Sequence, residues 1–133
     1  MKFYEIICFS QIENHLYLQQ KQLTDVCRQL NVTVTCYSPL GSGSSVVQSL
    51  PPPIHHPVVR RISEKYKKSP AQILLRYSIQ RGLAVIPSSS NSRRIKENID
   101  IFNFNLTPDE EKMLRNVDQG GRYRKFDFLF WTG

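Results

Sequence analysis

Hydrophobic and polar residues follow two different periods along the chain, and the period switches several times. Three short segments rich in β-branched and aromatic residues predict strands at residues 3–11, 32–37 and 83–86. In the second segment, Val32 and Val34 face one way while the threonines beside them face the other, which is the two-residue period of a strand. We therefore expect three strands that are well separated in the sequence.

The apolar period lengthens to that of a helix between the first two strands. Leu23, Val26, Cys27 and Leu30 recur at the spacing of one helical face. This spacing predicts a helix over residues 19–30 with these four side chains on one side.

Start and stop signals place two more helices before the third strand. Pro57 begins the first of them. Residues 69–72 then combine a serine cap, a proline in the first turn and a glutamine that can reach back to the cap. The helix that they start is expected to end at Gly82, because glycine adopts the conformation that terminates helices.

Two further helices are predicted after the third strand. The first covers residues 92–102, with Ile95, Ile99 and Phe102 facing inward. Residues 107–110 form a second capping box and start the last helix, which leads to an aromatic, basic tail.

The order of these elements indicates the fold class. Strands that alternate with helices imply parallel strands joined by crossover connections, so we expect an α/β protein in which residues 1–133 form part of one domain. A complete (β/α)8 barrel needs eight strands and about 250 residues. We therefore predict a partial (β/α)8 TIM barrel: its last three βα units, a C-terminal helix and the tail.

Composition narrows the choice of partner and compartment. The net charge of +7 favours anions, but the basic residues are spread along the chain and no nucleic-acid signature accompanies them. The three cysteines are odd in number and lack metal-ligand spacing, which indicates reduced thiols. No segment approaches the about 20 apolar residues of a membrane span. We expect a cytoplasmic protein with no membrane, metal or specific nucleic-acid partner.

Two segments carry the candidate chemistry. Residues 37–42 and 85–98 each read as a strand that ends in a Ser/Pro/Gly loop and then turns into a helix. Such loops present N–H groups and hydroxyls at a helix N-terminus, where an anion is stabilised. In (β/α)8 barrels, phosphates commonly bind to the loops after the last two strands. The two segments therefore predict a site for a phosphate-bearing ligand.

Four motifs, in the same order, resemble the aldo-keto reductases. Residues 10–17 resemble the family's Asn-Gln-Ile-Glu-x-His-Pro-Tyr motif, and residues 36–42 resemble its Tyr-Ser-Pro-Leu-Gly loop. Residues 69–76 resemble its Thr-x-Ala-Gln-x-x-x-Arg helix, and residues 85–98 its cofactor segment after strand eight. The chain thus resembles the C-terminal half of that family.

The resemblance implies an oxidoreductase that transfers hydride between NADP(H) and a small-molecule carbonyl or alcohol. It implies that Gln11 hydrogen-bonds the nicotinamide carboxamide and that Tyr37 stacks on the nicotinamide ring. Ser89 and Arg94 would hold the 2′-phosphate, because a guanidinium can donate paired hydrogen bonds to phosphate. The other implied cofactor residues are Ser38, Leu40, Ser42 and Ser44 at the pyrophosphate, and Glu97 and Asn98 at the adenine.

Two departures from the family pattern affect these expectations. Ser88 stands where the family often has a lysine, so a preference for NADP over NAD would rest on Arg94. The family's acid–base tyrosine and its supporting residues lie on the first four strands, and no segment here resembles those strands. We therefore assign no catalytic residue and expect this truncated chain, by itself, not to reduce carbonyls.

The sequence also allows other functions for the chain and other roles for some of its residues. The chain is alternatively a non-enzymatic nucleotide-binding or interaction fragment that pairs with a complementary barrel half, since three strands leave edges and apolar surface uncovered. A basic nucleic-acid binder is the third hypothesis. The alternative for Arg94 is a surface ion pair with Glu97. Glu13 and His15 are expected to have packing or hydrogen-bonding roles, and His55 and His56 lack a third ligand for zinc.

Overall fold

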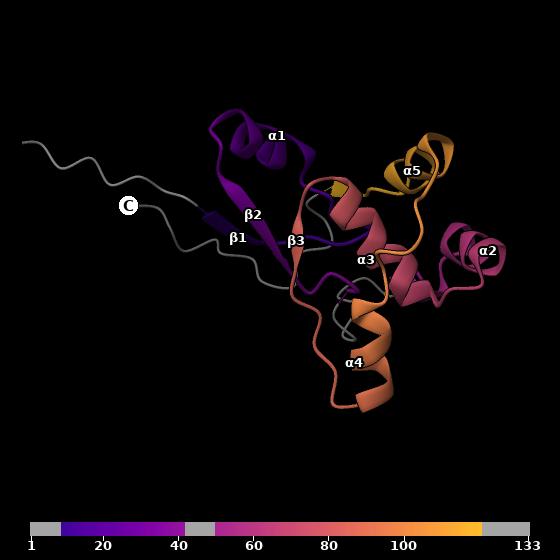
Figure 1. The fold of residues 1–133 in the computed structure, drawn as a ribbon. Coiled ribbons are helices and arrows are strands. Elements are labelled where there is room, and N and C mark those ends of the chain that lie inside the picture. Colours follow the sequence, from indigo (N-terminus) through magenta and orange to yellow (C-terminus); the bar gives the residue numbers. More distant parts are fainter. Residues whose placement is uncertain (1–8, 42–49, 121–133) are drawn as a thin grey trace, which may run out of the picture.

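The computed structural model describes residues 9–41 and 50–120, and these residues form an α/β unit with one parallel sheet (Figure 1). The strands β1 (Phe9–Glu13), β2 (Thr33–Tyr37) and β3 (Ala84–Val85) lie in the order β1-β2-β3. Both pairings are parallel. The predicted class and strand direction are confirmed.

Five helices connect and follow the strands within the described residues. The helix α1 (Lys21–Gln29) joins β1 to β2. Between β2 and β3 come a short 3-10 helix, η1 (Pro53–His55), and the helices α2 (Pro57–Tyr66) and α3 (Pro70–Gln80). After β3 come α4 (Ser92–Ile99) and α5 (Pro108–Arg115).

The two capping boxes form as the sequence predicts. The Ser69 hydroxyl accepts the Gln72 N–H at 3.3 Å, and the Gln72 side chain accepts the Ser69 N–H at 2.9 Å. Thr107 and Glu110 make the same reciprocal pair at the start of α5. Each box satisfies two N–H groups that have no partner within the helix, so these two helix starts are fixed by local sequence.

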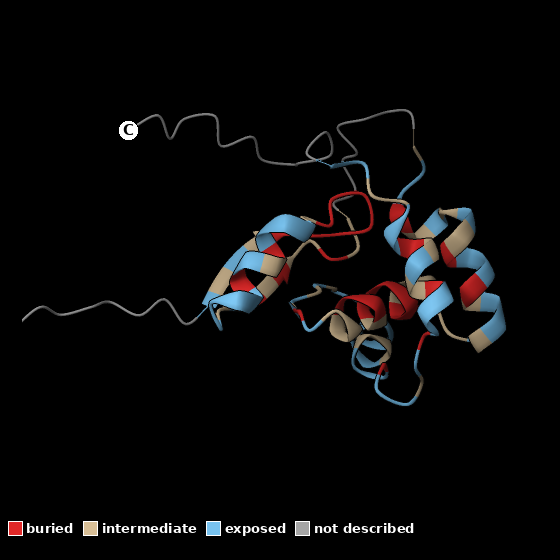
Figure 2. Cartoon of the chain, turned by 90° about the horizontal axis from the view of Figure 1, so that it is seen from above, coloured by how far each residue is buried: buried red, intermediate tan, exposed pale blue. Residues whose placement is uncertain are grey.

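The larger of two groups of buried apolar residues lies between α2, α3 and α5, and we call it the helical core. Figure 1 shows α3 at the centre, with β3 on one side and α2 and α5 on the other. Figure 2 shows the corresponding band of buried residues. The members of the helical core are Leu16, Tyr17, Val59, Ile62, Ile73, Leu74, Tyr77, Leu106 and Leu114.

The smaller group, which we call the sheet core, contains Cys27, Val34, Cys36 and Leu83. The prediction that one face of α1 is buried is only partly right. Cys27 is buried, but Leu23, Val26 and Leu30 are exposed, Leu30 by 68%. Because α1 packs mainly on β2, only the side of the helix that carries Cys27 is covered.

The prediction for α4 is wrong in two respects. The helix ends at Ile99 instead of Phe102, and Ile95, Ile99 and Phe102 are exposed instead of inward, Ile99 by 70%. None of the residues in α4 is buried. The helix is held by polar contacts at its C-terminal end, where Gln72 Nε2 donates to the Asp100 carbonyl at 2.9 Å and Lys68 pairs with the Asp100 carboxylate at 2.7 Å.

The two cysteines in the described residues, Cys27 and Cys36, are free and buried. Burial raises the pKa of the Cys36 thiol to about 11, so this thiol is protonated at neutral pH. Within residues 9–41 and 50–120, no helix has the length and apolar character needed to cross a membrane.

Candidate cofactor-binding site

An open cavity of about 700 Å³ lies beyond the carboxyl ends of β2 and β3. Its wall includes Leu40 and Gly41 from the loop after β2, and Ser88 and Ser89 from the loop after β3. The parallel pairing of Cys36 with Val85 brings these two loops to the same edge of the sheet. The cavity is therefore where the fold places ligands in open α/β sheets.

Half of the residues predicted for the cofactor line this one cavity. They come from two loops and from α4, and the last of them is 58 positions after the first. Their placement agrees with a shared site, although their individual roles stay predictions. The five residues are Leu40, Ser89, Arg94, Glu97 and Asn98.

The other predicted residues do not line the cavity or are not described. Gln11 is exposed on β1, opposite Thr35. Tyr37 is half-buried at the end of β2, and its carbonyl accepts the Asn14 N–H at 3.3 Å. Ser38 forms the turn that follows. Ser42 and Ser44, like the aromatic tail, lie outside the described residues.

The loop after β2 makes a tight turn against η1. Ser38 has a φ of 52°, and its carbonyl accepts the Gly41 N–H at 2.9 Å. Gly41 has a φ of 76°, and a Cβ at this position would come within 2.9 Å of the Pro53 ring. Glycine is therefore required by both its conformation and its surroundings, and the turn forms a closely packed part of the cavity wall.

The prediction of anion binding at two helix N-termini needs correction. Asn91 caps α4, and its side-chain oxygen accepts the N–H groups of Arg93 at 3.0 Å and Arg94 at 3.3 Å. These two donors are therefore already satisfied within the chain. The loop after β2 reaches α2 only after η1, and the cap there is His56. The backbone N–H groups of Arg93 and Arg94 are thus not free donors for a ligand, and the prediction for this cavity is left to its side chains.

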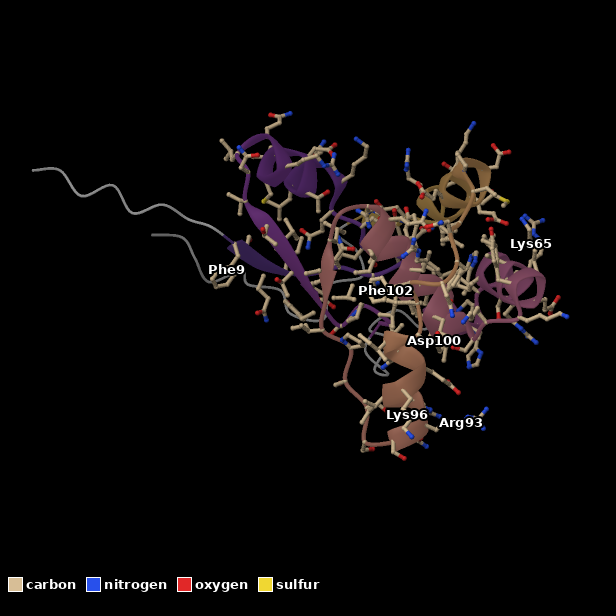
Figure 3. All side chains as sticks on the ribbon, in the orientation of Figure 1. Phe9, Lys65, Arg93, Lys96, Asp100 and Phe102 are labelled. Atoms are coloured by element: carbon tan, nitrogen blue, oxygen red, sulfur yellow. The ribbon has the colours of Figure 1, made fainter. Side chains whose placement is uncertain are left out.

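The ion pair considered between Arg94 and Glu97 does not form. Glu97 pairs instead with Arg93, with 2.9 Å between Arg93 Nε and Glu97 Oε1. Figure 3 shows Arg93 beside Lys96 on α4. Among the described residues, the Arg94 guanidinium has no hydrogen bond or ion pair. Its charge is thus available to a ligand in the cavity.

Sequence reasoning missed two basic residues of the cavity, His55 and Arg60. Arg60 lies in the first turn of α2, between Val59 and Arg61. The helical period shows that Arg60 is not on the buried face, but it does not show which neighbouring element that turn approaches. No local sequence signal could have assigned Arg60 to this site.

The remaining candidate residues make contacts within the chain, as their expected packing and hydrogen-bonding roles require. Glu13 and His15 are buried, with 3.6 Å between Glu13 Oε1 and His15 Nε2. His56 Nδ1 accepts the Val58 N–H at 3.3 Å, and burial lowers the pKa of His56, which favours the neutral ring that can accept. No group of three or more metal-ligating side chains gathers within residues 9–41 and 50–120.

Comparisons with known proteins find relatives that match most of this chain. The chain is 41% identical over 125 residues to aldo-keto reductase family 1 member D1 of Oryctolagus cuniculus, covering 92% of this chain and 38% of the relative. It is 41% identical over 119 residues to the NAD(P)H-dependent D-xylose reductase of Aspergillus niger, covering 85% and 37%. It is 39% identical over 138 residues to estradiol 17 beta-dehydrogenase 5 of Mus musculus, covering 96% and 42%.

The chain therefore spans about two fifths of the length of these curated relatives. The profile of the Aldo/keto reductase family matches residues 2–119, which include every described strand and helix. A match over most of the chain, together with relatives near 40% identity, shows that this chain belongs to the aldo/keto reductase family.

Proposed function

We propose that this chain carries the NADP(H)-binding part of an oxidoreductase that interconverts carbonyls and alcohols by hydride transfer. The observation that supports this most is the Arg94 guanidinium, which lines the cavity without a partner among the described residues. Ser89 and Asn98 add polar groups to the same wall, and Ile54, Pro70 and other residues supply apolar surface. Few polar groups on apolar walls are typical of cofactor sites.

The proposed fold context is the last part of a (β/α)8 barrel. The strands are parallel, and the cavity lies at the carboxyl ends of β2 and β3, as in barrels of this class. The exposed side chains of Leu30, Ile95, Ile99 and Phe102 support a role in packing against further structure, such as a complementary barrel half. A non-enzymatic nucleotide-binding or interaction fragment is the alternative that this surface favours.

The residues of this chain would bind and orient the cofactor, which itself supplies the hydride. Arg94 would bind the 2′-phosphate, with Ser89 donating a hydrogen bond, and Glu97 and Asn98 would contact the adenine. Tyr37 would stack on the nicotinamide ring and Gln11 would hold its carboxamide. Ser38, Leu40, Ser42 and Ser44 would line the pyrophosphate. A small-molecule carbonyl is the proposed substrate class.

A thermal melt of the purified chain with and without excess NADPH tests this proposal. Ligand at 100 times its dissociation constant adds about 2.7 kcal/mol of stability, so the melting temperature should rise. Arg94→Gln should reduce the rise. The control is Lys96→Gln, which removes one charge from the same helix outside the cavity wall and should leave the rise in melting temperature unchanged (Figure 3). A wild-type melting temperature unchanged by NADPH would contradict the proposal.

A further inference from the structure

A second arginine lines the cavity, and it comes from an element far from the predicted cofactor segment. Arg60 of α2 lines the same wall as Arg94, which belongs to α4. Among the described residues, no acidic side chain pairs with Arg60, and its side chain makes no hydrogen bond. Two arginines 34 positions apart thus converge on one space from different helices.

The position of Arg60 is set by the packing of its helix. Val59 and Ile62, on the other side of α2, are buried in the helical core. The Arg60 N–H donates to the His56 carbonyl at 3.0 Å, so its backbone is part of the first helical turn. Since α2 packs on α3, whose first residues also line the cavity, Arg60 is presented by a fixed element.

The charge balance of the cavity wall favours a phosphate. Its charged or titratable residues are His55, Arg60, Arg94 and Glu97. The one carboxylate, Glu97, is engaged by Arg93, which does not line the cavity. Two lysines of α2 and of the segment that follows it do not add to this charge, because Lys65 pairs with Glu110 and Lys68 pairs with Asp100. The two guanidinium groups of the cavity are the uncompensated charges of this wall, and guanidinium matches phosphate geometry.

We propose that Arg60 is a second residue for the 2′-phosphate of NADP(H), shared with Arg94, and that it makes the cavity prefer NADP(H) to NAD(H). The inference rests on the proposed cofactor function. It also explains how the site retains two cations although Ser88 supplies none. The adenosine 2′-phosphate is the group that NAD(H) lacks, so a residue that binds it changes the affinity of only one cofactor.

The test is the dissociation constant of NADPH and of NADH for the purified chain and its variants, measured by calorimetric titration. Arg60→Gln should raise the dissociation constant of NADPH by about tenfold to a hundredfold, since a hydrogen bond to a charged group contributes that much. The dissociation constant of NADH should change by less than about twofold. The matched control is Arg61→Gln, because Arg61 contacts Met113 of α5 and does not line the cavity. Arg60→Lys, which keeps the charge, should restore part of the affinity.

Three results would overturn the inference. The first is a dissociation constant for NADPH that is the same in Arg60→Gln as in a wild-type chain that binds NADPH. Another is an equal loss for NADPH and NADH, which would assign Arg60 to the pyrophosphate. The last is an equal loss of NADPH affinity in Arg61→Gln, which would show that the net charge of the chain, and not the position of Arg60, determines the affinity. A wild-type chain that binds neither cofactor would contradict the proposed function itself, and the inference with it. A melt without ligand confirms that each variant is folded.

Discussion

The helical core and a second region, made of the sheet, α1 and α4, differ in how completely they bury their apolar residues. In the helical core, α2, α3 and α5 cover one another, and Ile73 and Leu114 have no exposed surface. In the other region, the sheet core has four residues, and α1 and α4 leave large apolar side chains exposed. Figure 2 shows this contrast, with exposed residues over α1 and buried residues at the centre of the helices.

The difference teaches that local signals and burial are separate requirements. Both regions form helices and strands near where the sequence predicts them, because periods and caps act within a few residues, although α4 ends three residues early and β1 extends two residues beyond its predicted end. Burial also needs a second surface. The helices α2, α3 and α5 find that surface in one another, whereas α1 and α4 find little of it within residues 9–41 and 50–120. Their apolar faces support the proposal that further structure packs there.

The largest effect should come from removing the same atoms in the two regions. Ile73→Ala truncates a side chain with 0% exposure in the helical core and should cost about 2–5 kcal/mol of unfolding free energy. Ile99→Ala makes the identical change on α4, where the side chain is 70% exposed, and should cost less than about 0.5 kcal/mol. Urea unfolding of the two variants measures both values.

This pair of variants also tests whether the two regions differ in burial when the chain is in solution. If Ile99→Ala destabilises the chain as much as Ile73→Ala does, the apolar face of α4 is covered in solution, for example by a second copy. Sedimentation of the wild type at several concentrations would then be expected to show association.

A smaller loss should follow from Gln19→Ala, which removes a polar connection between the segment after β1 and the helical core. The buried Gln19 side chain donates to the carbonyls of Leu16 at 2.9 Å and Leu114 at 2.8 Å, and accepts the Tyr77 hydroxyl at 2.8 Å. Leaving such groups without partners costs about 1–3 kcal/mol. Gln22→Ala, at an exposed position of α1, is the control and should be nearly neutral.

In thermal melts, the melting temperature of Gln19→Ala should therefore be lower than that of Gln22→Ala. Equal melting temperatures would mean that water replaces the Gln19 side chain and that the connection contributes little to stability.

The smallest effect concerns the pH dependence of the helical core. Burial raises the pKa of Glu110, but hydrogen bonds from the Lys65 ammonium, the Thr107 N–H and the Tyr66 hydroxyl outweigh it and lower the pKa from 4.5 to about 2. Because the folded pKa is below the unfolded one, the stabilisation is complete above pH 4.5 and is lost as the pH falls toward 2. Lys65 is 58% exposed, so screening limits the effect to about 1 kcal/mol.

Unfolding free energies measured across this pH range should show a flatter profile for Glu110→Gln than for the wild type. Glu64→Gln, an exposed carboxylate of α2, is the control and should keep the wild-type profile. An unchanged slope in Glu110→Gln would assign the acid sensitivity to other groups.

Much of the fold could be predicted because its signals are local. The serine and threonine caps at Ser69 and Thr107 fix helix starts, and the alternation around Val34 gives a strand. The exposure of Ile95 and Leu30 could not be predicted from their hydrophobic period. A hydrophobic period identifies the face that could be buried, but not whether another element covers it.

The same distinction applies to the candidate site. The sequence by itself determined the α/β class, the parallel direction of the strands and the motifs that contain Leu40, Ser89 and Arg94, three residues of one cavity wall. Only the tertiary structure decided that Arg60 of α2 joins the cavity wall beside Arg94 of α4, whereas the pairing of Glu97 with Arg93 is an i,i+4 contact within α4. Motifs record residues that act within one segment, whereas the convergence of Arg60 and Arg94 on one cavity depends on how separate helices pack, and no local pattern contains that information.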